Sequence, residues 1–304
     1  MSVVQWDAGV IRERSRRMLR LARKGWTKSG KITREARTRL RSHLARIVHP
    51  RRLARTTLSS YMWRYFFRTE GWFHEMAAVV WDCLLTFQSR TGIRGHLLEI
   101  GVWRGKSAIL QAMHAAPDEQ LVLVDVRIRD EMKRTIGRVK PSRAHCLEIN
   151  SRDLSTTPLY LEGSRSYRWI HIDGEHTGPA LATDLDTANH LLSAAGIVTI
   201  DDFLSPKYPQ LTRTTFDYVS QHEGDLQMFL CGFNKAYLCR PGMAPTYLRF
   251  VKESLHADMR LRGYGNVTIF KTAYPNDMNC FGIDARYEGL NYRGPDADEQ
   301  LIAI

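Results

Sequence analysis

The chain has 304 residues and a formal net charge of +12 at pH 7, from 44 Lys and Arg residues against 32 Asp and Glu residues. Hydrophobic residues make up 43% and charged residues 25% of the sequence, which excludes a fully disordered chain, a collagen repeat and a disulfide-rich miniprotein. The length is sufficient for one large domain or two small ones with a proper core.

The positive charge is concentrated at the N-terminus. Residues 1–60 hold 17 basic and 3 acidic residues, whereas the rest of the chain holds 27 and 29. Apolar residues recur every three to four positions over residues 11–26 and again over residues 32–47, which predicts two basic amphipathic helices. This arm, residues 1–57, is compatible with contact to an anionic membrane or a nucleic acid, and with packing on its own domain or on a second subunit of a homo-oligomer.

The cysteines and the hydropathy of the sequence indicate the cellular compartment of the protein. The five cysteines include no C-x-x-C pair, which disfavours a zinc cluster and a disulfide framework. No stretch approaches 18 apolar residues, so we expect no transmembrane helix. Arginines interrupt any apolar segment that a secretory signal would need. We therefore expect a cytoplasmic protein, with the arm allowing peripheral attachment to a membrane, although an Arg-rich start is also compatible with an organelle transit peptide.

Residues 58–93 are rich in aromatic side chains. Seven of them, either Tyr, Trp or Phe, lie between Tyr61 and Phe73, and a helix is expected over residues 72–88. Such a cluster is more often a lid or a core element than a separate site. We expect this segment to be a helical lid or linker beside a substrate pocket.

From residue 94 the sequence alternates strands and helices. Apolar strands are expected at residues 97–101, 121–126, 144–149, 169–173 and 196–200, and helices at 107–116, 130–139, 179–194 and 211–221. Continuous apolar strands that alternate with helices predict a parallel sheet covered on both faces. Residues 226–230 and 234–239 predict a closing antiparallel hairpin.

The predicted fold class is therefore α/β. A doubly wound, Rossmann-like domain spans residues 94–240 and follows a helical N-terminal extension. A C-terminal extension, residues 241–304, is expected to hold one helix near residues 246–261 and an otherwise irregular chain.

The turn after the first strand reads E-I-G-V-W-R-G-K-S over residues 99–107. Trp103 stands where a dinucleotide-binding fingerprint needs a glycine, and a phosphate-binding P-loop would need one more residue. The spacing of Glu99, Gly101 and Gly105 fits better the nucleoside-binding loop of class I methyltransferases. The next strand ends at Asp125, where an acid can accept hydrogen bonds from both ribose hydroxyls. The alternative is that Asp125 serves only as a carboxylate at the start of the next helix.

Carboxylates also end two later strands. The fourth strand stops at Asp173 and the fifth at Asp201 and Asp202. If these strands are neighbours, their ends lie about 5 Å apart, and three converging carboxylates need a cation or shared protons. Oxygen ligands suit Mg²⁺ or another divalent cation, and His176 is placed to act as a base. The alternative is that Asp201 and Asp202 cap the following helix while His176 packs locally.

Four motifs in order resemble those of a known family: L-L-E-I-G-V-W-R-G-K-S, L-V-L-V-D, W-I-H-I-D-G-E-H-T and G-I-V-T-I-D-D-F. Together they resemble class I S-adenosylmethionine-dependent methyltransferases. The likeness is greatest to the bacterial branch with D-G-x-H and I-D-D-[FY] signatures, which includes metal-dependent sugar and macrolide O-methyltransferases. The resemblance covers roughly residues 93–205.

The resemblance implies a role for each matching residue. The methionine part of the cofactor would be held by Glu99, Gly101 and Gly105, with the amides near Lys106 and Ser107. The ribose would be held by Asp125, and the adenine would be contacted by Asn150 and Ser151. The metal would be bound by Asp173, Asp201 and Asp202, and the catalytic residues would be His176, as the base, and Asp173.

The function predicted from the sequence is a metal-assisted transfer of a methyl group from S-adenosylmethionine to a hydroxyl of a small molecule or sugar. Two other classes stay open at this point. One is a different enzyme on the same scaffold, for example a hydroxylase-like protein. The other is a protein that binds nucleic acid or a membrane through the basic arm, although the near-neutral remainder of the chain disfavours an RNA acceptor.

Overall fold

The computed structural model describes residues 56–140, 143–272, 275 and 277–285. They divide between two compact units, with the boundary after Glu70. The two predicted basic helices, at residues 11–26 and 32–47, lie outside the described residues. So does the end of the C-terminal extension, from residue 286.

The described part of the first unit is helical. Helix α3, Thr57–Tyr61, begins at Thr56, whose Oγ1 accepts a hydrogen bond from the Ser59 amide at 3.2 Å. It continues into the π-helical segment η2, Met62–Phe66. The ring of Phe66 packs edge-on against Tyr61 and Phe67, with centroid distances of 5.8 and 5.1 Å. The aromatic segment thus begins as a short helical unit whose rings pack on one another.

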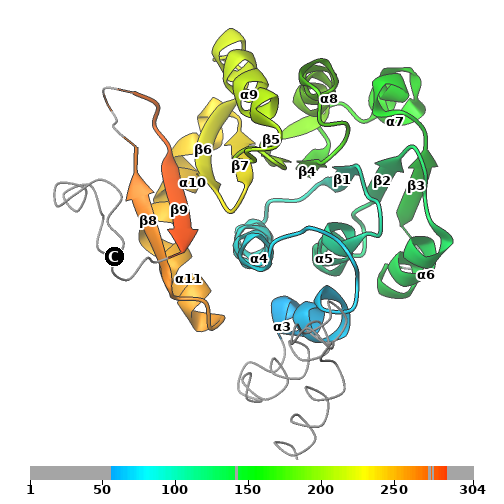
Figure 1. Ribbon diagram of the computed structural model, residues 1–304, viewed down its shortest axis with the longest axis horizontal. Helices are drawn as coiled ribbons and strands as arrows, with labels where there is room; N and C mark the ends of the chain where they lie inside the picture. Colours follow the sequence, from blue (N-terminus) through cyan, green and yellow to red (C-terminus); the bar gives the residue numbers. More distant parts are fainter. Residues whose placement is uncertain (1–55, 141–142, 273–274, 276, 286–304) are drawn as a thin grey trace, which may run out of the picture. The chain divides into compact units, whose positions relative to one another are not determined.

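The second unit is built on one nine-stranded sheet with the order β3-β2-β1-β4-β5-β7-β6-β9-β8 (Figure 1). The first five strands run parallel: β1 His96–Ile100, β2 Leu121–Asp125, β3 Ala144–Glu148, β4 Tyr167–Ile172 and β5 Leu192–Ile200. The hairpin strands β6 Gln227–Gly232 and β7 Lys235–Cys239 follow, with β7 antiparallel to β5. The predicted doubly wound fold with a closing hairpin is confirmed.

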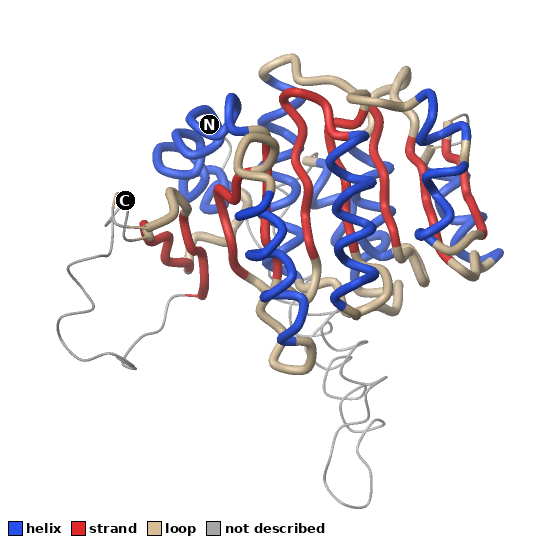
Figure 2. The backbone as a smooth tube through the Cα atoms, turned by 90° about the horizontal axis from the view of Figure 1, so that it is seen from above, coloured by secondary structure: helices blue, strands red, loops and turns tan. Residues whose placement is uncertain are grey.

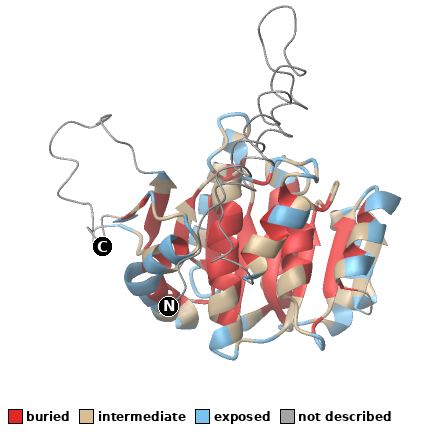
Figure 3. Ribbon diagram, turned by 90° about the horizontal axis from the view of Figure 1, so that it is seen from below, coloured by how far each residue is buried: buried red, intermediate tan, exposed pale blue. Residues whose placement is uncertain are grey.

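Helices cover both faces of this sheet (Figure 1). On one face lie α4 Glu75–Arg90, α5 Lys106–His114 and α6 Asp130–Val139, and on the other α7 Pro158–Glu162, α8 Gly178–Leu191 and α9 Pro209–Gln221. The central strands are therefore buried on both sides, as Figure 3 shows. Burial accordingly runs continuously along β1, β2 and β4 rather than alternating from residue to residue.

The C-terminal extension contains more structure than predicted. The single helix expected at residues 246–261 is a continuous helical run made of α10 Ala244–Phe250, the π-helical segment η5 Val251–Leu255 and α11 His256–Leu261, after a turn η4 at Pro241–Met243. The part expected to be irregular adds two strands, β8 Val267–Lys271 and β9 Phe281–Ala285. Strand β9 runs parallel to β6 and antiparallel to β8, so the extension continues the sheet (Figure 2).

The predictions on transmembrane helices and on the cysteines concern the described part of the chain. None of the helices described there is both long and apolar enough to cross a membrane. All five cysteines are free thiols, and Cys83, Cys239 and Cys280 are buried.

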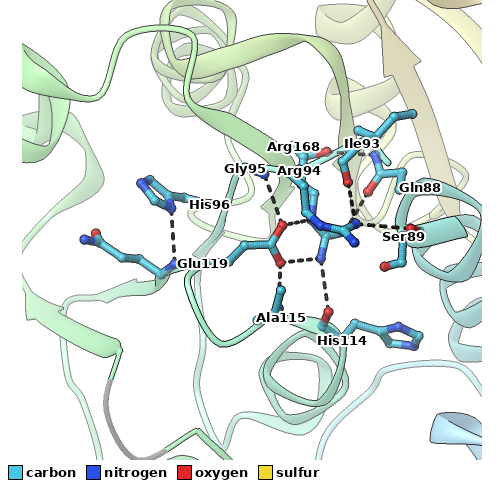
Figure 4. Close-up of polar contacts among 12 residues, drawn as sticks. Gln88, Ser89, Ile93, Arg94, Gly95, His96, His114, Ala115, Glu119 and Arg168 are labelled. Atoms are coloured by element: carbon cyan, nitrogen blue, oxygen red, sulfur yellow. Dashed lines mark hydrogen bonds and ion pairs between the residues drawn. The ribbon is translucent and has the colours of Figure 1, made fainter. Parts of the chain in front are cut away.

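A buried network of polar contacts joins β4 to α4 and to the segment before β2, at the amino-terminal ends of the strands (Figure 4). Arg168, at the start of β4, is fully buried and donates two hydrogen bonds to Glu119, from Nε at 2.7 Å and from Nη2 at 2.8 Å. It also donates to Gln88 Oε1 on α4 at 2.9 Å. Burial acts to raise the pKa of Glu119, but Arg168 outweighs it and lowers that pKa.

The predicted site residues lie at the opposite, carboxyl-terminal ends of the strands. Strands β1, β4 and β5 are parallel neighbours, with Ile100 beside Ile172 and Ile172 beside Ile200. The loops that follow them therefore leave the same edge of the sheet, which is where ligands bind in folds of this kind. Strand β7 runs the other way, so its first residue, Lys235, lies at this edge as well.

Candidate active site

The loop after β1 turns sharply because of its glycines. Gly101 has φ +83°, and a Cβ at this position would collide with the carbonyl oxygen of Asp173. Gly105 has φ +75° and begins α5 in the left-handed conformation, where a Cβ would lie 2.6 Å from Cγ of Met132. Only glycine adopts this conformation without steric cost. The two glycines therefore bring the chain close to β4 and turn it into α5.

Asp125 organises the same loop. Its Oδ2 accepts hydrogen bonds from the amides of Val102 and Trp103, both at 2.8 Å, and its Oδ1 accepts one from Arg127 at 3.0 Å. A carboxylate has about four acceptor positions, so the half-buried Asp125 retains capacity for a ribose hydroxyl. The carboxylate at the end of strand β2 thus supports the glycine loop and keeps an acceptor position available to a ligand.

Glu99 lies beneath the loop. It is fully buried, and its oxygens accept hydrogen bonds from the hydroxyl of Ser107 and, at 2.6 Å, from Gln111 Nε2, while His171 Nδ1 lies at 3.1 Å. Glu99 therefore ties β1 to α5 and β4. Any effect of this side chain on a cofactor passes through the position of the loop.

Three other residues predicted to contact the cofactor lie at the same edge. Burial lowers the pKa of Lys106 to about 8, and its Nζ lies 3.4 Å from the carbonyl oxygen of Gly71. Asn150 is exposed after β3 and accepts a hydrogen bond from the Arg152 amide at 3.0 Å, which starts the short helix η3, Ser151–Thr156. Since β3 lies beside β2, Asn150 and Ser151 follow the strand next to Asp125.

The acidic cluster predicted from the strand ends is present. His176 Nε2 lies 2.9 Å from Asp202 Oδ2 and 3.7 Å from Asp173 Oδ1. The two carboxylates raise the pKa of His176 to about 10. The imidazole also stacks on the ring of Tyr208, with centroids 4.3 Å apart, and the carbonyl of His176 accepts a hydrogen bond from Gln210. His176 is therefore held in one orientation by groups from the loops after β4 and β5 and from the first turn of α9.

The donor set suits a divalent cation. Asp173, His176 and Asp202 each offer one ligand atom, and these atoms lie within 4.8 Å of one another. Burial and the neighbouring Asp201 raise the pKa of Asp173 to about 6. Two carboxylates that solvent reaches, beside an imidazole, form a chemically suitable site for Mg²⁺ or a related ion.

Asp201 has different partners. Its Oδ1 accepts a hydrogen bond from the Asp202 amide at 2.7 Å, and its Oδ2 lies 2.5 Å from Lys235 Nζ and 3.7 Å from His171 Nε2. Burial acts to raise the pKa of Asp201, but Lys235 and His171 hold it well below its usual range. The carboxylates of Asp201 and Glu99 in turn raise the pKa of the buried His171 to about 9, against the effect of burial.

Four residues around these carboxylates were not singled out from the sequence. They are His171, Tyr208, Lys235 and Asn234, whose side-chain amide donates a hydrogen bond to Asp202 Oδ1 at 2.7 Å. A signal existed for two of them, because His171 and Lys235 are polar residues within the apolar runs W-I-H-I-D and K-A-Y-L-C. A polar side chain in a buried strand needs a partner, and here the partners are Glu99 and Asp201.

Residues 71–74 cross this edge of the sheet ahead of α4. Trp72 stacks on Trp103 of the glycine loop at 4.6 Å, and His74 stacks on Phe233 of the β6–β7 turn at 5.7 Å. Between them, Phe73 lies 5.3 Å from the ammonium of Lys235. The Trp72 side chain is 81% exposed. This segment therefore presents aromatic surface beside the acidic cluster, as expected for the wall of a substrate pocket.

The glycine loop, Asp125 and the acidic cluster lie within a segment that matches a known protein family. Residues 98–203 match a family model described as a methyltransferase domain. This segment is therefore similar to a methyltransferase domain. The match runs from β1 to the turn after β5, and it includes the glycine loop, Asp125 and the acidic cluster. It confirms the resemblance to methyltransferases that the four sequence motifs predicted.

Solved structures similar to the chain include three methyltransferases. The O-methyltransferase NovP is 16% identical, with 54% of this chain and 80% of NovP covered at a TM-score of 0.42. CalS11, a TDP-rhamnose 3'-O-methyltransferase of calicheamicin biosynthesis, is 16% identical, with 78% and 97% covered at 0.47. MycE of the mycinamycin pathway, in complex with Mg and SAH, is 15% identical, with 61% and 55% covered at 0.45. No curated protein matches the chain in sequence.

A further acid lies just under the methyltransferase site. Asp184 on α8 is fully buried and directed at the loop after β4, where a Cβ on Gly174 would lie 2.9 Å from its Oδ2. No hydrogen bond reaches either oxygen from the described residues. Burial raises the pKa of Asp184 to about 6, with Ser151 and Arg152 opposing this shift and Glu175 adding to it.

Replacing Asp184 with asparagine is expected to remove a pH-dependent loss of stability. The folded-state pKa lies above the ordinary value of 3.8, so the folded chain binds this proton more tightly than the unfolded chain does. The contribution to stability is complete below about pH 4 and is lost as the pH rises through about 6, a change of about 3 kcal/mol. Urea unfolding of both proteins across this range should show a steeper decline for the natural chain, and equal slopes would contradict the assignment.

Proposed function

We propose that this chain transfers a methyl group from S-adenosylmethionine to a hydroxyl group of a small molecule or sugar, with the help of a divalent cation. One observation carries the proposal. The acidic cluster of Asp173, His176 and Asp202 lies at the same sheet edge as the glycine loop and Asp125, within a methyltransferase domain.

The residues at β1 and β2 fit the cofactor. When bound, S-adenosylmethionine supplies a methyl group already activated on a sulfonium. Asp125 would accept hydrogen bonds from the ribose, and the loop between Gly101 and Gly105 would hold the methionine part. Glu99 holds this loop from beneath through Ser107 and Gln111. Asn150 and Ser151 border the space next to Asp125, where the adenine would lie.

The residues at β4 and β5 fit the acceptor. His176 Nε2, which lies 2.9 Å from Asp202 Oδ2 in the free chain, would take the proton of the acceptor hydroxyl as the new carbon–oxygen bond forms and the carbon–sulfur bond breaks, once a cation engages Asp202. A divalent cation on Asp173 and Asp202 would polarise the acceptor hydroxyl and offset the negative charge that holds a proton on His176. The aromatic residues Trp72 and Trp103 would cover a sugar or a similar small acceptor.

The test is methyl transfer by the full chain, measured by mass spectrometry with sugar nucleotides, glycosides and other vicinal diols as acceptors. Chelation with EDTA is expected to reduce the rate at least about tenfold, and added Mg²⁺ should restore it. Binding of S-adenosylhomocysteine, measured by calorimetry, should not change on chelation. Full activity in EDTA would refute the role of the metal, and binding of ATP in place of S-adenosylhomocysteine would refute the cofactor.

A further inference from the structure

Lys235 is a buried cation within the acidic cluster. Its side chain is 2% exposed, and its Nζ lies 2.5 Å from Asp201 Oδ2. The rings of Phe73 and Trp81 lie 5.3 and 5.7 Å from the ammonium. Its backbone is fixed as well, because Lys235 pairs with Gly232 across the β6–β7 hairpin and the next residue pairs with Ile200 of β5. The strand and the aromatic rings therefore hold the ammonium against Asp201.

The carboxylates of Asp173, Asp201 and Asp202 are consequently not equivalent. Both oxygens of Asp201 are engaged, one by the Asp202 amide and the other by Lys235, and its side chain is 15% exposed. Asp173 is 33% exposed, and its nearest cation is His176 at 3.7 Å. Asp202 is 22% exposed and bonds to His176 and to the neutral amide of Asn234. A cation from solvent therefore reaches Asp173 and Asp202, whereas at Asp201 it must displace a buried ammonium.

We propose that Lys235 is a positioning residue that withdraws Asp201 from metal coordination, so that a divalent cation is held by Asp173 and Asp202 and binds the free protein weakly. This inference rests on the proposed function for the presence of the cation. Affinity for a hard divalent ion rises with the number of charged oxygen ligands. Lys235 removes one ligand of three and adds a repelling charge nearby. Water completes the coordination in the free protein, and an acceptor that replaces this water with its own oxygen atoms would tighten the binding of the cation.

The first experiment measures Mn²⁺ binding to the full chain by electron paramagnetic resonance, without cofactor or acceptor. The variant Lys235→Met removes the charge and keeps the length of the side chain, and it should bind Mn²⁺ at least about tenfold more tightly. Lys235→Arg retains the charge and should keep the affinity of the natural chain. Lys140→Met is the matched control, because Lys140 is a buried lysine whose Nζ bonds to backbone carbonyls after α5, away from the cluster. Damage to the fold would not tighten binding, so a gain in affinity reports on Lys235 itself.

The second experiment does not depend on the stability of Lys235 variants. Asp201→Asn should weaken Mn²⁺ binding only slightly, through the uncompensated charge of Lys235, whereas Asp202→Asn should weaken it at least about tenfold. In the Lys235→Met background, Asp201→Asn should abolish the gain, which a double-mutant cycle measures as coupling. Equal losses for Asp201→Asn and Asp202→Asn, no tightening in Lys235→Met, or no Mn²⁺ binding by any variant would overturn the inference. The expected binding pattern without methyl transfer would refute only the proposed function.

Discussion

Replacing Arg168 with methionine is expected to lower the free energy of unfolding by about 3–5 kcal/mol. The substitution leaves the carboxylate of Glu119 buried without its cationic partner and removes the hydrogen bond to Gln88 on α4. An unpaired buried charge costs far more than the pair itself contributes. Urea denaturation followed by circular dichroism measures the loss.

A surface pair provides the matched control. Arg152 and Glu175 are also an arginine and a glutamate, at 2.9 Å, but both side chains are 51% exposed. Arg152→Ala should therefore change the free energy of unfolding by less than about 1 kcal/mol. Replacing Arg168 and Glu119 together by apolar residues should recover part of the stability. A loss from Arg168→Met no larger than that from Arg152→Ala would show that the network does not support the fold.

Replacing His176 with alanine is expected to lower kcat for methyl transfer by about 10²- to 10⁴-fold, the usual contribution of a general base. His176 lies at the end of the site where the acceptor would bind, remote in sequence from the cofactor loop and Asp125. Binding of S-adenosylhomocysteine should accordingly stay unchanged. Single-turnover kinetics and calorimetry on the same preparation separate the two effects.

A second histidine serves as the comparison. His222 also stacks on a tyrosine, Tyr218, at 4.0 Å, but it follows α9 at the far end of that helix from the site. His222→Ala should leave kcat within about twofold of the natural chain, because it has no contact with the reacting groups. Turnover of His176→Ala equal to that of His222→Ala would remove His176 from the mechanism.

The strands that carry the site could be predicted because each is a short, mostly apolar run with a carboxylate at or next to its end. Burial on both faces forces this pattern on β1, β2, β4 and β5, and the order of a doubly wound sheet then brings their ends together. The positions of Asp125, Asp173 and Asp202 followed from these two rules alone. Strands β8 and β9 did not, since they pair with each other and with β6 across long separations, and their own residues carry no such pattern.

The pairing of charges could not be predicted in the same way. Lys235 lies 34 positions after Asp201 on a strand that runs in the opposite direction, so the contact depends on the register between β5 and β7. Glu99 shows the converse case. Its place in the motif predicts contact with the cofactor, but nothing in the motif predicts its hydrogen bonds from Ser107 and Gln111, in the first and second turns of α5.

The network around Arg168 has a consequence for how this scaffold can change. The groups that fasten α4 and the sheet lie at one end of the strands, and the loops that would meet a substrate lie at the other. Substitutions in those loops, including residues 71–74 and the β6–β7 turn, do not alter the contacts of Arg168 with Glu119 and Gln88. Exposed residues of these loops, such as Trp72, can therefore be exchanged to alter the candidate site without removing any contact of the Arg168 network.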